Sequence, residues 1–173
     1  MIIAVMSDSH DHMENLKRAV SAAVEKGAGM IIHCGDLVAP FMLPILAGSG
    51  LPVHAVFGNN DGDRFLLTKF SLTKFHNITF HGEWGRIDDG NGFAAAFTHY
   101  RETALGLFSE GKYRLVCYGH THQHFSRKEG GTLLLNPGEI MGKDEQAGFC
   151  LVDTITGGFR REVLWPGGEP TRP

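Results

Sequence analysis

The sequence has few cysteines and no long hydrophobic run. Its three cysteines, Cys34, Cys117 and Cys150, lie far apart in the chain, within or beside apolar segments. We therefore expect reduced, buried thiols in a cytoplasmic protein. No apolar stretch approaches the ~20 residues that a membrane-spanning helix needs, and no basic segment precedes the first apolar run, as it would in a signal peptide. A membrane partner is not expected.

The sequence also lacks a cluster of positive charge. Sixteen Lys and Arg residues stand against 19 Asp and Glu residues, the net charge is −3, and no basic run is present. Binding along a phosphate backbone depends on many such cations, so an extended nucleic-acid surface is not expected. A small substrate fits this composition better. The sequence does not determine the oligomeric state, and a homo-oligomer is compatible with it.

The composition is that of a globular protein with one domain. The chain has 173 residues, of which 42% are hydrophobic and 20% are charged. This length is enough to bury a core without disulfides or structural metals. We expect a single domain over residues 1–165, followed by a disordered Gly- and Pro-rich tail over residues 166–173. The ten histidines are the unusual feature, and their positions are informative.

The first dozen residues contain the clearest motif. The apolar run from Ile2 to Met6 reads as a strand buried on both faces, and it is followed at once by Asp8 and His10. Side chains two apart on extended backbone project to the same side, so these two could converge on one cation. In isolation, a polar turn at the end of a strand explains the motif equally well.

The same arrangement recurs along the chain. Apolar runs at residues 30–34, 53–57, 93–97 and 115–118 read as strands, and each is followed by residues that can bind a metal. Between the strands, residues 13–26, 41–47 and 102–110 have helical patterns, which predicts parallel strands joined by crossovers. The region from 62 to 89 is the least regular; a helix over 65–75 and a strand over 78–80 are its candidates. Antiparallel strands are predicted over 125–128, 132–135, 149–153 and 159–165.

Each of these polar residues has an ordinary explanation by itself. Asp36 could cap a helix, Asn59 could fill a turn, and His99 could be a buried core histidine. Together they place seven oxygen or nitrogen ligands at the ends of five strands: Asp8, His10, Asp36, Asn59, His99, His120 and His122. Seven are too many for one ion with an open position, but they suit two ions about 3.5–4 Å apart that share a carboxylate. Asp36 is the natural shared ligand. Imidazole and carboxylate without thiolate favour transition metals: Mn²⁺ first, then Ni²⁺, Fe²⁺ or Zn²⁺.

These motifs resemble the calcineurin-like metallophosphoesterases. The similarity rests on Asp8-Ser9-His10, Gly35-Asp36, Gly58-Asn59-Asn60-Asp61, His99 and Gly119-His120-Thr121-His122. With Asn136-Pro137-Gly138-Glu139 and the short length, the chain looks like the small bacterial and archaeal phosphodiesterase branch. The resemblance implies an α/β fold, a four-layer α/β/β/α sandwich with two packed mixed sheets and a metal site at the carboxyl ends of strands. It also implies that Asp8, His10, Asp36 and His122 hold one metal, and that Asp36, Asn59, His99 and His120 hold the other.

The expected reaction is hydrolysis of a phosphate ester, most specifically a phosphodiester. A hydroxide that bridges the two metals would attack phosphorus in line. Asn60 could donate its amide to a phosphoryl oxygen, Asp61 could orient the loop, and Arg101 is a speculative further phosphate contact. Asn60 departs from the family, which mostly has a proton-donating His there, and Tyr100-Arg101 replaces the usual Gly after His99. Ordinary roles as turn filler, helix cap and surface charge remain open for Asn60, Asp61 and Arg101.

Four other functions are alternatives to this reading. The eukaryotic retromer subunit with this fold is a non-catalytic scaffold, but the complete set of seven ligand residues argues for an enzyme here. A phosphomonoesterase is a closer alternative. A Rossmann protein or a Ser hydrolase would need Gly-x-Gly-x-x-Gly or Gly-x-Ser-x-Gly, and the chain has neither motif.

Overall fold

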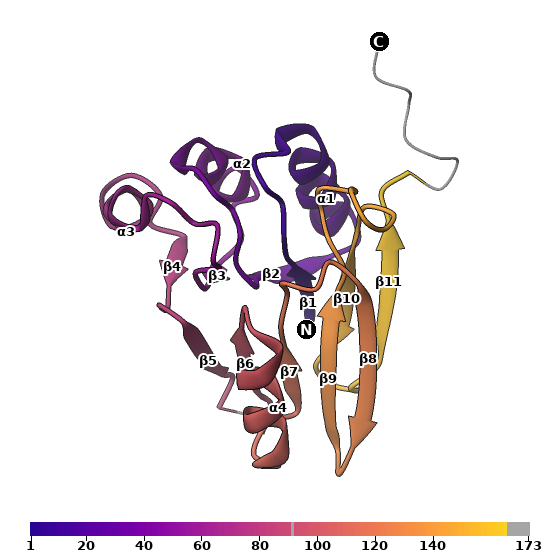
Figure 1. Ribbon diagram of the computed structural model, residues 1–173. Helices are drawn as coiled ribbons and strands as arrows, with labels where there is room; N and C mark the ends of the chain where they lie inside the picture. Colours follow the sequence, from indigo (N-terminus) through magenta and orange to yellow (C-terminus); the bar gives the residue numbers. More distant parts are fainter. Residues whose placement is uncertain (91, 166–173) are drawn as a thin grey trace.

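The computed structural model describes residues 1–90 and 92–165 and shows two β-sheets packed face to face (Figure 1). The first sheet has the strand order β11-β10-β1-β2-β3-β4, in which β1 to β4 run parallel, β10 is antiparallel to β1, and β11 is antiparallel to β10. Its strands are β1 (Ile2–Met6), β2 (Ala28–His33), β3 (Val53–Ala55), β4 (Ile78–Phe80), β10 (Gly148–Asp153) and β11 (Phe159–Val163).

The second sheet has the order β5-β6-β7-β9-β8. Strands β6, β7 and β9 are parallel, and β5 and β8 are antiparallel strands at the two edges. The parallel pairing of β9 with β7 corrects our expectation that the C-terminal strands pair only in antiparallel fashion. The strands are β5 (Trp84–Asp88), β6 (Ala94–Thr98), β7 (Leu115–Cys117), β8 (His124–Glu129) and β9 (Thr132–Pro137).

Helices cover the outer face of each sheet. Figure 1 shows α1, α2 and α3 over the first sheet and α4 over the second. Three hydrophobic clusters separate the four layers, one under α1 to α3, one between the sheets and one under α4. The bounds are α1 (Met13–Glu25), a 3₁₀ turn (Pro40–Met42), α2 (Leu43–Ala47), α3 (Arg64–Thr73) and α4 (Arg101–Ser109). The α/β/β/α sandwich is therefore confirmed.

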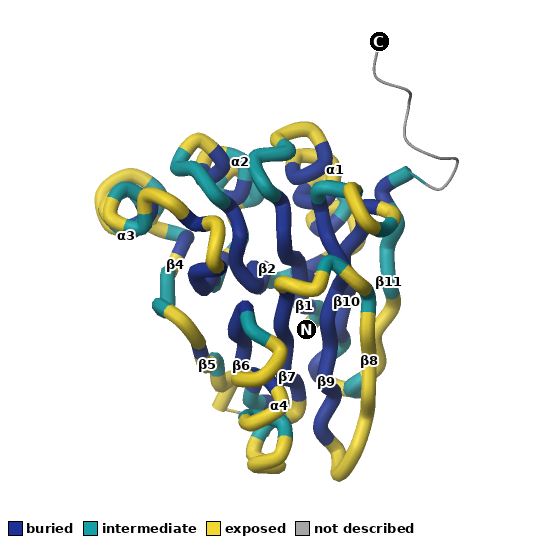
Figure 2. Tube along the Cα trace, in the orientation of Figure 1, coloured by how far each residue is buried: buried dark blue, intermediate teal, exposed yellow. Residues whose placement is uncertain are grey.

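Strand β1 shows why the sequence forms this sandwich. Ala4 and Met6 pack into the cluster beneath the helices, whereas Ile3 and Val5 pack into the cluster between the sheets. A strand in the middle layers is covered on both faces and is therefore apolar at every position. Figure 2 shows the same burial along the central strands, with exposure concentrated in loops and edge strands.

Strand β5 is the element that sequence analysis missed. Exposed and more buried positions alternate along this strand, and only Gly85 is fully buried. The residues are Trp84, Gly85, Arg86, Ile87 and Asp88. Such a half-exposed edge strand carries little apolar signal. The three cysteines are buried and form no disulfide with one another, as predicted. No helix among the described residues has the length and hydropathy to cross a membrane. The predicted tail, residues 166–173, lies outside the described residues.

Candidate metal centre

The seven candidate ligands converge where the carboxyl ends of strands from both sheets meet. Asp8, Asp36 and Asn59 follow β1, β2 and β3 of the first sheet. His99, His120 and His122 follow β6 and β7 of the second. The expected single edge is thus a junction of two sheets, which brings the chain's distant motifs together. Asp8, Asp36 and His99 are buried, His10 and His122 are half-buried, and Asn59 and His120 are exposed, so the cluster has a buried floor and a mouth open to solvent.

One group of side chains surrounds the Asp8 carboxylate. His122 Nε2 lies 3.5 Å and His10 Nε2 lies 3.8 Å from Asp8 Oδ1. The ring centroids of His10 and His122 are 5.0 Å apart. The other Asp8 oxygen accepts a hydrogen bond of 3.1 Å from the backbone N–H of His120. These three side chains offer ligand atoms close enough together to share one ion.

The second group lies around His99. Its Nε2 atom is 2.9 Å from Asn59 Oδ1 and 3.5 Å from Asp36 Oδ2. The His120 ring packs against the His99 ring at a centroid distance of 5.0 Å. These contacts bring together Asp36, Asn59, His99 and His120, and their assignment to one metal stays a prediction.

Two carboxylates lie between the groups. Asp36 Oδ2 is 3.3 Å from His10 Nε2 in one group and 3.5 Å from His99 Nε2 in the other. Asp8 also offers ligand atoms to both, with His10 and His122 on one side and with Asp36 and His99 on the other. Asp36 remains our prediction for the shared ligand because its carboxylate approaches a histidine from each half, and Asp8 is the alternative.

The loops that carry these residues have unusual backbone conformations. Asp8, His10, Asp36, His120 and His122 all have positive φ, between 39° and 67°. This left-handed region is uncommon outside glycine, and clusters of it are typical of functional sites. Glycines allow the loops to approach closely: a Cβ on Gly58 would lie 2.2 Å from Asp36 Oδ1. The spacing of glycine and acid in these motifs therefore has a direct steric cause.

Asp61 joins two of these loops. Its buried carboxylate accepts N–H hydrogen bonds from Asp36 (3.0 Å), Val38 (2.7 Å) and Gly58 (2.7 Å). Burial raises the pKa of Asp61 although these donors oppose the shift. Asp61 thus links the loop after β2 to the loop after β3, and its orienting role in catalysis stays a prediction.

Asn60 also acts on Asp36. Its backbone N–H donates to Asp36 Oδ1 at 2.8 Å, and its side-chain amide donates to Asp36 Oδ2 at 2.8 Å. The amide that we expected to face a phosphoryl oxygen is therefore engaged with a candidate metal ligand. Burial raises the pKa of Asp36, but the neighbouring His10 imidazole and the hydrogen bonds from Asn60 outweigh it and hold that pKa well below its usual range.

The cluster has the electrostatic character of a cation site. The carboxylates of Asp36 and Asp8 raise the pKa of His10 to about 9, against the opposing effect of burial. The raised pKa of His10 shows that the two carboxylates favour a positive charge between them, and a bound cation would supply that charge in place of a proton.

Buried polar atoms without hydrogen bonds also indicate a cation site. Asp8 Oδ1 and His10 Nε2 are buried and have no hydrogen-bond partner among the described residues. Such atoms are rare because an unsatisfied buried polar group costs about 1–3 kcal/mol. The residues therefore fit divalent metal ions held by carboxylate and imidazole.

The remaining predicted residue, Arg101, lies at the rim. It is exposed at the first position of α4, and its guanidinium interacts with the Tyr118 phenol. Next to it, Tyr100 packs its ring edge-on against His99 and His120, at centroid distances of 5.2 and 5.4 Å. The departure from the family at these two positions thus places a phenol against the second group of ligands.

Sequence analysis missed two contacts behind the cluster. Glu139, fully buried, lies with Oε2 2.7 Å from His122 Nδ1. Ser9 Oγ lies 3.3 Å from Nε2 of the buried His33, and burial lowers the pKa of that histidine to about 4. The motif Asn136-Pro137-Gly138-Glu139 was visible in the sequence, but nothing in it indicates which side chain the carboxylate meets.

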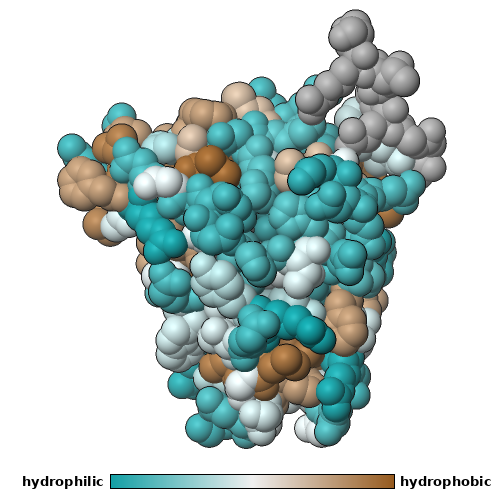
Figure 3. Space-filling model, viewed as in Figure 1, coloured by the Kyte–Doolittle hydropathy of each residue, from teal (hydrophilic) through white to brown (hydrophobic). Residues whose placement is uncertain are grey.

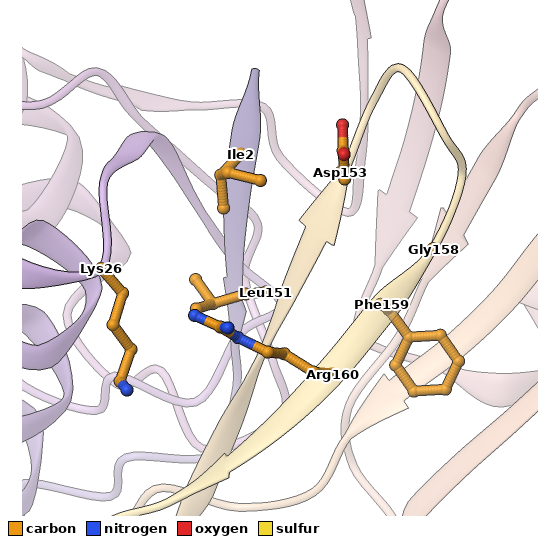
Figure 4. A pocket seen from close by; sticks show the side chains of 7 residues that line it. All are labelled: Ile2, Lys26, Leu151, Asp153, Gly158, Phe159 and Arg160. Atoms are coloured by element: carbon orange, nitrogen blue, oxygen red, sulfur yellow. The ribbon is translucent and has the colours of Figure 1, made fainter.

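A pocket of about 470 Å³ lies elsewhere (Figure 4). It is bounded by Ile2, at the opposite end of β1 from Asp8, and by Lys26, Leu151, Phe159 and Arg160. Both of its basic side chains are paired with Glu162. The pocket is therefore separate from the candidate metal centre, and its two basic side chains share one carboxylate.

The sequence matches a family model over most of its length. Residues 1–157 match the model described as the calcineurin-like phosphoesterase superfamily domain. A phosphodiesterase from Methanocaldococcus jannaschii is 30% identical over 143 residues, covering 82% of this chain and 86% of that protein. A probable metallophosphoesterase from Bacillus subtilis, YsnB, is 30% identical over 145 residues, covering 81% of this chain and 75% of the relative.

Solved structures show the same fold. The structure of an archaeal phosphodiesterase has a TM-score of 0.86 and 28% identity, and covers 94% of this chain and 99% of its own. Vps29 from Entamoeba histolytica, solved with Zn²⁺, has a TM-score of 0.66 at 19% identity, covering 97% of this chain and 95% of its own. At that identity, the second comparison shows a shared fold and no more.

Proposed function

The chain belongs to the calcineurin-like phosphoesterase superfamily, and from that membership we propose that it is a phosphodiesterase that uses two divalent metal ions. The observation that carries the proposal is the convergence of seven ligand-type side chains from five strand ends, with two buried ligand atoms, Asp8 Oδ1 and His10 Nε2, that have no hydrogen-bond partner among the described residues. The similarity to proteins named as phosphodiesterases supports the reaction class.

We propose the ligand sets that the family resemblance implies. Asp8, His10, Asp36 and His122 would hold one ion, and Asp36, Asn59, His99 and His120 the other. Mn²⁺ is the first expectation, with Ni²⁺, Fe²⁺ or Zn²⁺ as alternatives. When bound, such ions lower the pKa of water and neutralise the charge of a phosphate.

The side chains around the ligands then have separate roles. Asp61 holds two ligand loops together through three backbone hydrogen bonds, and Asn60 orients the Asp36 carboxylate through two. Arg101, exposed at the start of α4, is the proposed additional contact for a phosphate oxygen. An Asn at position 60 cannot protonate a leaving group at neutral pH, so the departing oxygen would leave as an anion or take a proton from water.

This arrangement favours diesters with good leaving groups. Diesters carry one negative charge where monoesters carry two, and outside the candidate ligands the rim offers only the guanidinium of Arg101 among the residues named above. We therefore expect an aryl phosphodiester to be hydrolysed faster than the matching monoester.

The test is a screen of the purified, chelator-treated protein with Mn²⁺, Ni²⁺, Zn²⁺ or Mg²⁺ against an aryl phosphodiester and an aryl phosphomonoester. Hydrolysis that requires a transition metal and prefers the diester is the expected result. Asp8→Ala provides the control for contaminating phosphatases and should be inactive. Preference for the monoester would favour a phosphomonoesterase, and a metal-loaded protein that hydrolyses neither substrate would favour a scaffold.

A further inference from the structure

We propose that Glu139 is a positioning residue that sets the tautomer of His122 and thereby prepares it as a metal ligand. This inference rests on the proposed function, since it assigns His122 to a metal. It concerns a buried carboxylate to which neither the motif pattern nor the mechanism above gives a role. Glu139 lies in the segment between β9 and β10, opposite the loop after β7 that carries His122.

The position of Glu139 is fixed by the backbone. Glu139 is fully buried, and its Oε1 atom accepts the backbone N–H groups of Asp144 and of Glu145, the latter at 2.8 Å. The other oxygen, Oε2, lies 2.7 Å from His122 Nδ1. In the described part of the chain, His122 is the one basic side chain within ion-pairing distance of Glu139. The two carboxylate oxygens of Glu139 thus have different partners: Oε1 binds the backbone of the loop, and Oε2 contacts the His122 ring.

An ionised carboxylate can only accept a hydrogen bond. The proton of the neutral His122 ring must therefore sit on Nδ1, and Nε2 then carries a lone pair. That lone pair points into the cluster, because Nε2 lies 3.5 Å from Asp8 Oδ1. Two electron-pair donors that face each other in this way repel unless a cation lies with them. Glu139 thus selects the form of His122 that can bind a metal.

The group around His99 also fixes the tautomer of its histidine through a hydrogen bond from Nδ1, but there the acceptor is neutral. His99 Nδ1 donates to the backbone carbonyl of Cys34 at 2.8 Å, and its Nε2 faces Asn59 and Asp36. A carboxylate in place of a carbonyl makes the bound imidazole more basic as well as oriented. The two halves are therefore built differently, and a change at Glu139 should affect only the half that contains His122.

Glu139→Gln is the informative substitution. Its single amide oxygen would be needed by the backbone N–H groups of Asp144 and Glu145, so its NH₂ group would face His122 Nδ1. Nδ1 would then have to accept, which places the proton on Nε2, directed at Asp8. Loss of such an outer partner typically weakens metal binding by about 10–100-fold. We expect this loss for one ion and unchanged affinity for the other.

Asp144→Asn is the matched control. Asp144 Oδ2 lies 3.5 Å from the same Nδ1 atom, but its side chain is 52% exposed. The control removes an equal charge at a similar position without removing the hydrogen bond. An exposed pair of this kind contributes little, so metal affinity should change by about twofold or less.

The experiment combines ring ¹⁵N NMR of the chelator-treated protein with competition titrations of Zn²⁺. Expected results are an Nδ1–H tautomer for His122 in the wild type and in Asp144→Asn, an Nε2–H tautomer in Glu139→Gln, and weakening of one Zn²⁺ site alone. An Nε2–H tautomer in the wild type, unchanged affinity in Glu139→Gln, or equal loss of both sites would overturn the proposal. If Glu139→Gln does not fold, the wild-type tautomer decides.

The NMR measurement needs no metal and no substrate. Failure of the proposed function and failure of the Glu139 assignment can therefore be distinguished. A wild-type protein that binds no Zn²⁺ would contradict the proposed function. The tautomer of His122 would still support or overturn the assignment of Glu139.

Discussion

The Asp36 side chain has a central position among the candidate ligands. It approaches a histidine from each proposed half, receives two hydrogen bonds from Asn60, and leads the loop that Asp61 holds. Its place between the halves is a feature of geometry that the bare motif Gly35-Asp36 does not contain.

We predict that Asp36→Asn removes both metals and abolishes turnover, whereas Asp8→Asn weakens chiefly one ion. The reason is that a shared ligand serves both ions, and an amide lacks the charge that holds them. Metal content measured by elemental analysis, alongside the hydrolysis rate, tests this. Asp63→Asn, an exposed acid-to-amide change at the cap of α3, is the control and should alter neither. The reverse pattern, with both ions lost only in Asp8→Asn, would make Asp8 the shared ligand.

At position 60 we expect an effect on leaving-group protonation. Its amide binds Asp36 and cannot supply a proton to a leaving group. General acid catalysis is typically worth ~10²–10⁴-fold, and poor leaving groups depend on it most. We predict a steep dependence of rate on leaving-group pKa across a series of aryl phosphodiesters, and a flatter one in Asn60→His. Equal slopes for the two proteins would show that this position does not control leaving-group protonation.

At the scale of elements, a histidine pair joins β3 to the connection after β4. His54 Nδ1 and His81 Nε2 are 2.9 Å apart, and both rings pack against Phe97 of the second sheet. Burial lowers the pKa of both histidines, and for His54 the neighbouring His81 adds to the effect. The pair thus lies at a place where the chain passes between the two sheets.

This pair should make stability depend on pH. Because the pKa of each histidine is lower in the folded protein than in the unfolded chain, the unfolded chain binds more protons as the pH falls. The contribution is complete above the ordinary pKa of 6.5 and is lost progressively below it. We predict that His54→Asn loses less stability than the wild type between pH 7 and pH 5.

Thermal melts of the metal-free proteins measure this difference, since about 1 kcal/mol moves Tm by ~2–4 °C in a chain of this size. The exposed His76 provides the control, and His76→Asn should behave as the wild type does. If Tm falls with pH equally in the wild type and in His54→Asn, the His54–His81 pair does not contribute to the loss of stability in acid.

The surface also has distinct regions. In Figure 3 most of the visible face is hydrophilic, and apolar side chains gather over α3. Phe65 and Leu72 of this helix are 73% and 70% exposed.

For the whole molecule, metal binding should stabilise the fold. The candidate ligands follow β1, β2 and β3 of one sheet and β6 and β7 of the other, so bound ions would connect the two sheets. We predict up to two transition metals per chain by elemental analysis and a rise in Tm when Mn²⁺ or Ni²⁺ is added. A ligand at a hundredfold excess over its Kd stabilises a protein by about 2.7 kcal/mol.

Asp36→Asn should show no such rise, which separates specific binding from a general salt effect. Recovery of metal-free wild-type protein after loading, with an unchanged Tm, would contradict the two-metal centre and favour a scaffold role.

The sequence by itself determined which strands are buried on both faces, and it indicated the class of chemistry. Fully apolar runs such as Ile2–Met6 mark strands covered on both faces, because periodicity and burial are local consequences of composition. Ligand-type residues after five such runs indicated a metal centre, and the family match supports that class. Local pattern was weakest where burial is partial, so β5 was missed. The parallel pairing of the fully buried β9 with β7 was not anticipated because the pairing partner of a strand is not encoded in its own burial pattern.

Only the tertiary structure decided which side chains meet. The candidate ligands come from two sheets, and no local pattern states that Asp36 lies between His10 and His99, or that Asn60 binds Asp36. The contact of Glu139 with His122 joins residues 17 positions apart on separate loops. Such contacts depend on how the sheets pack and on the left-handed turns after the strands, which are set by long-range burial and hydrogen bonding rather than by neighbouring residues.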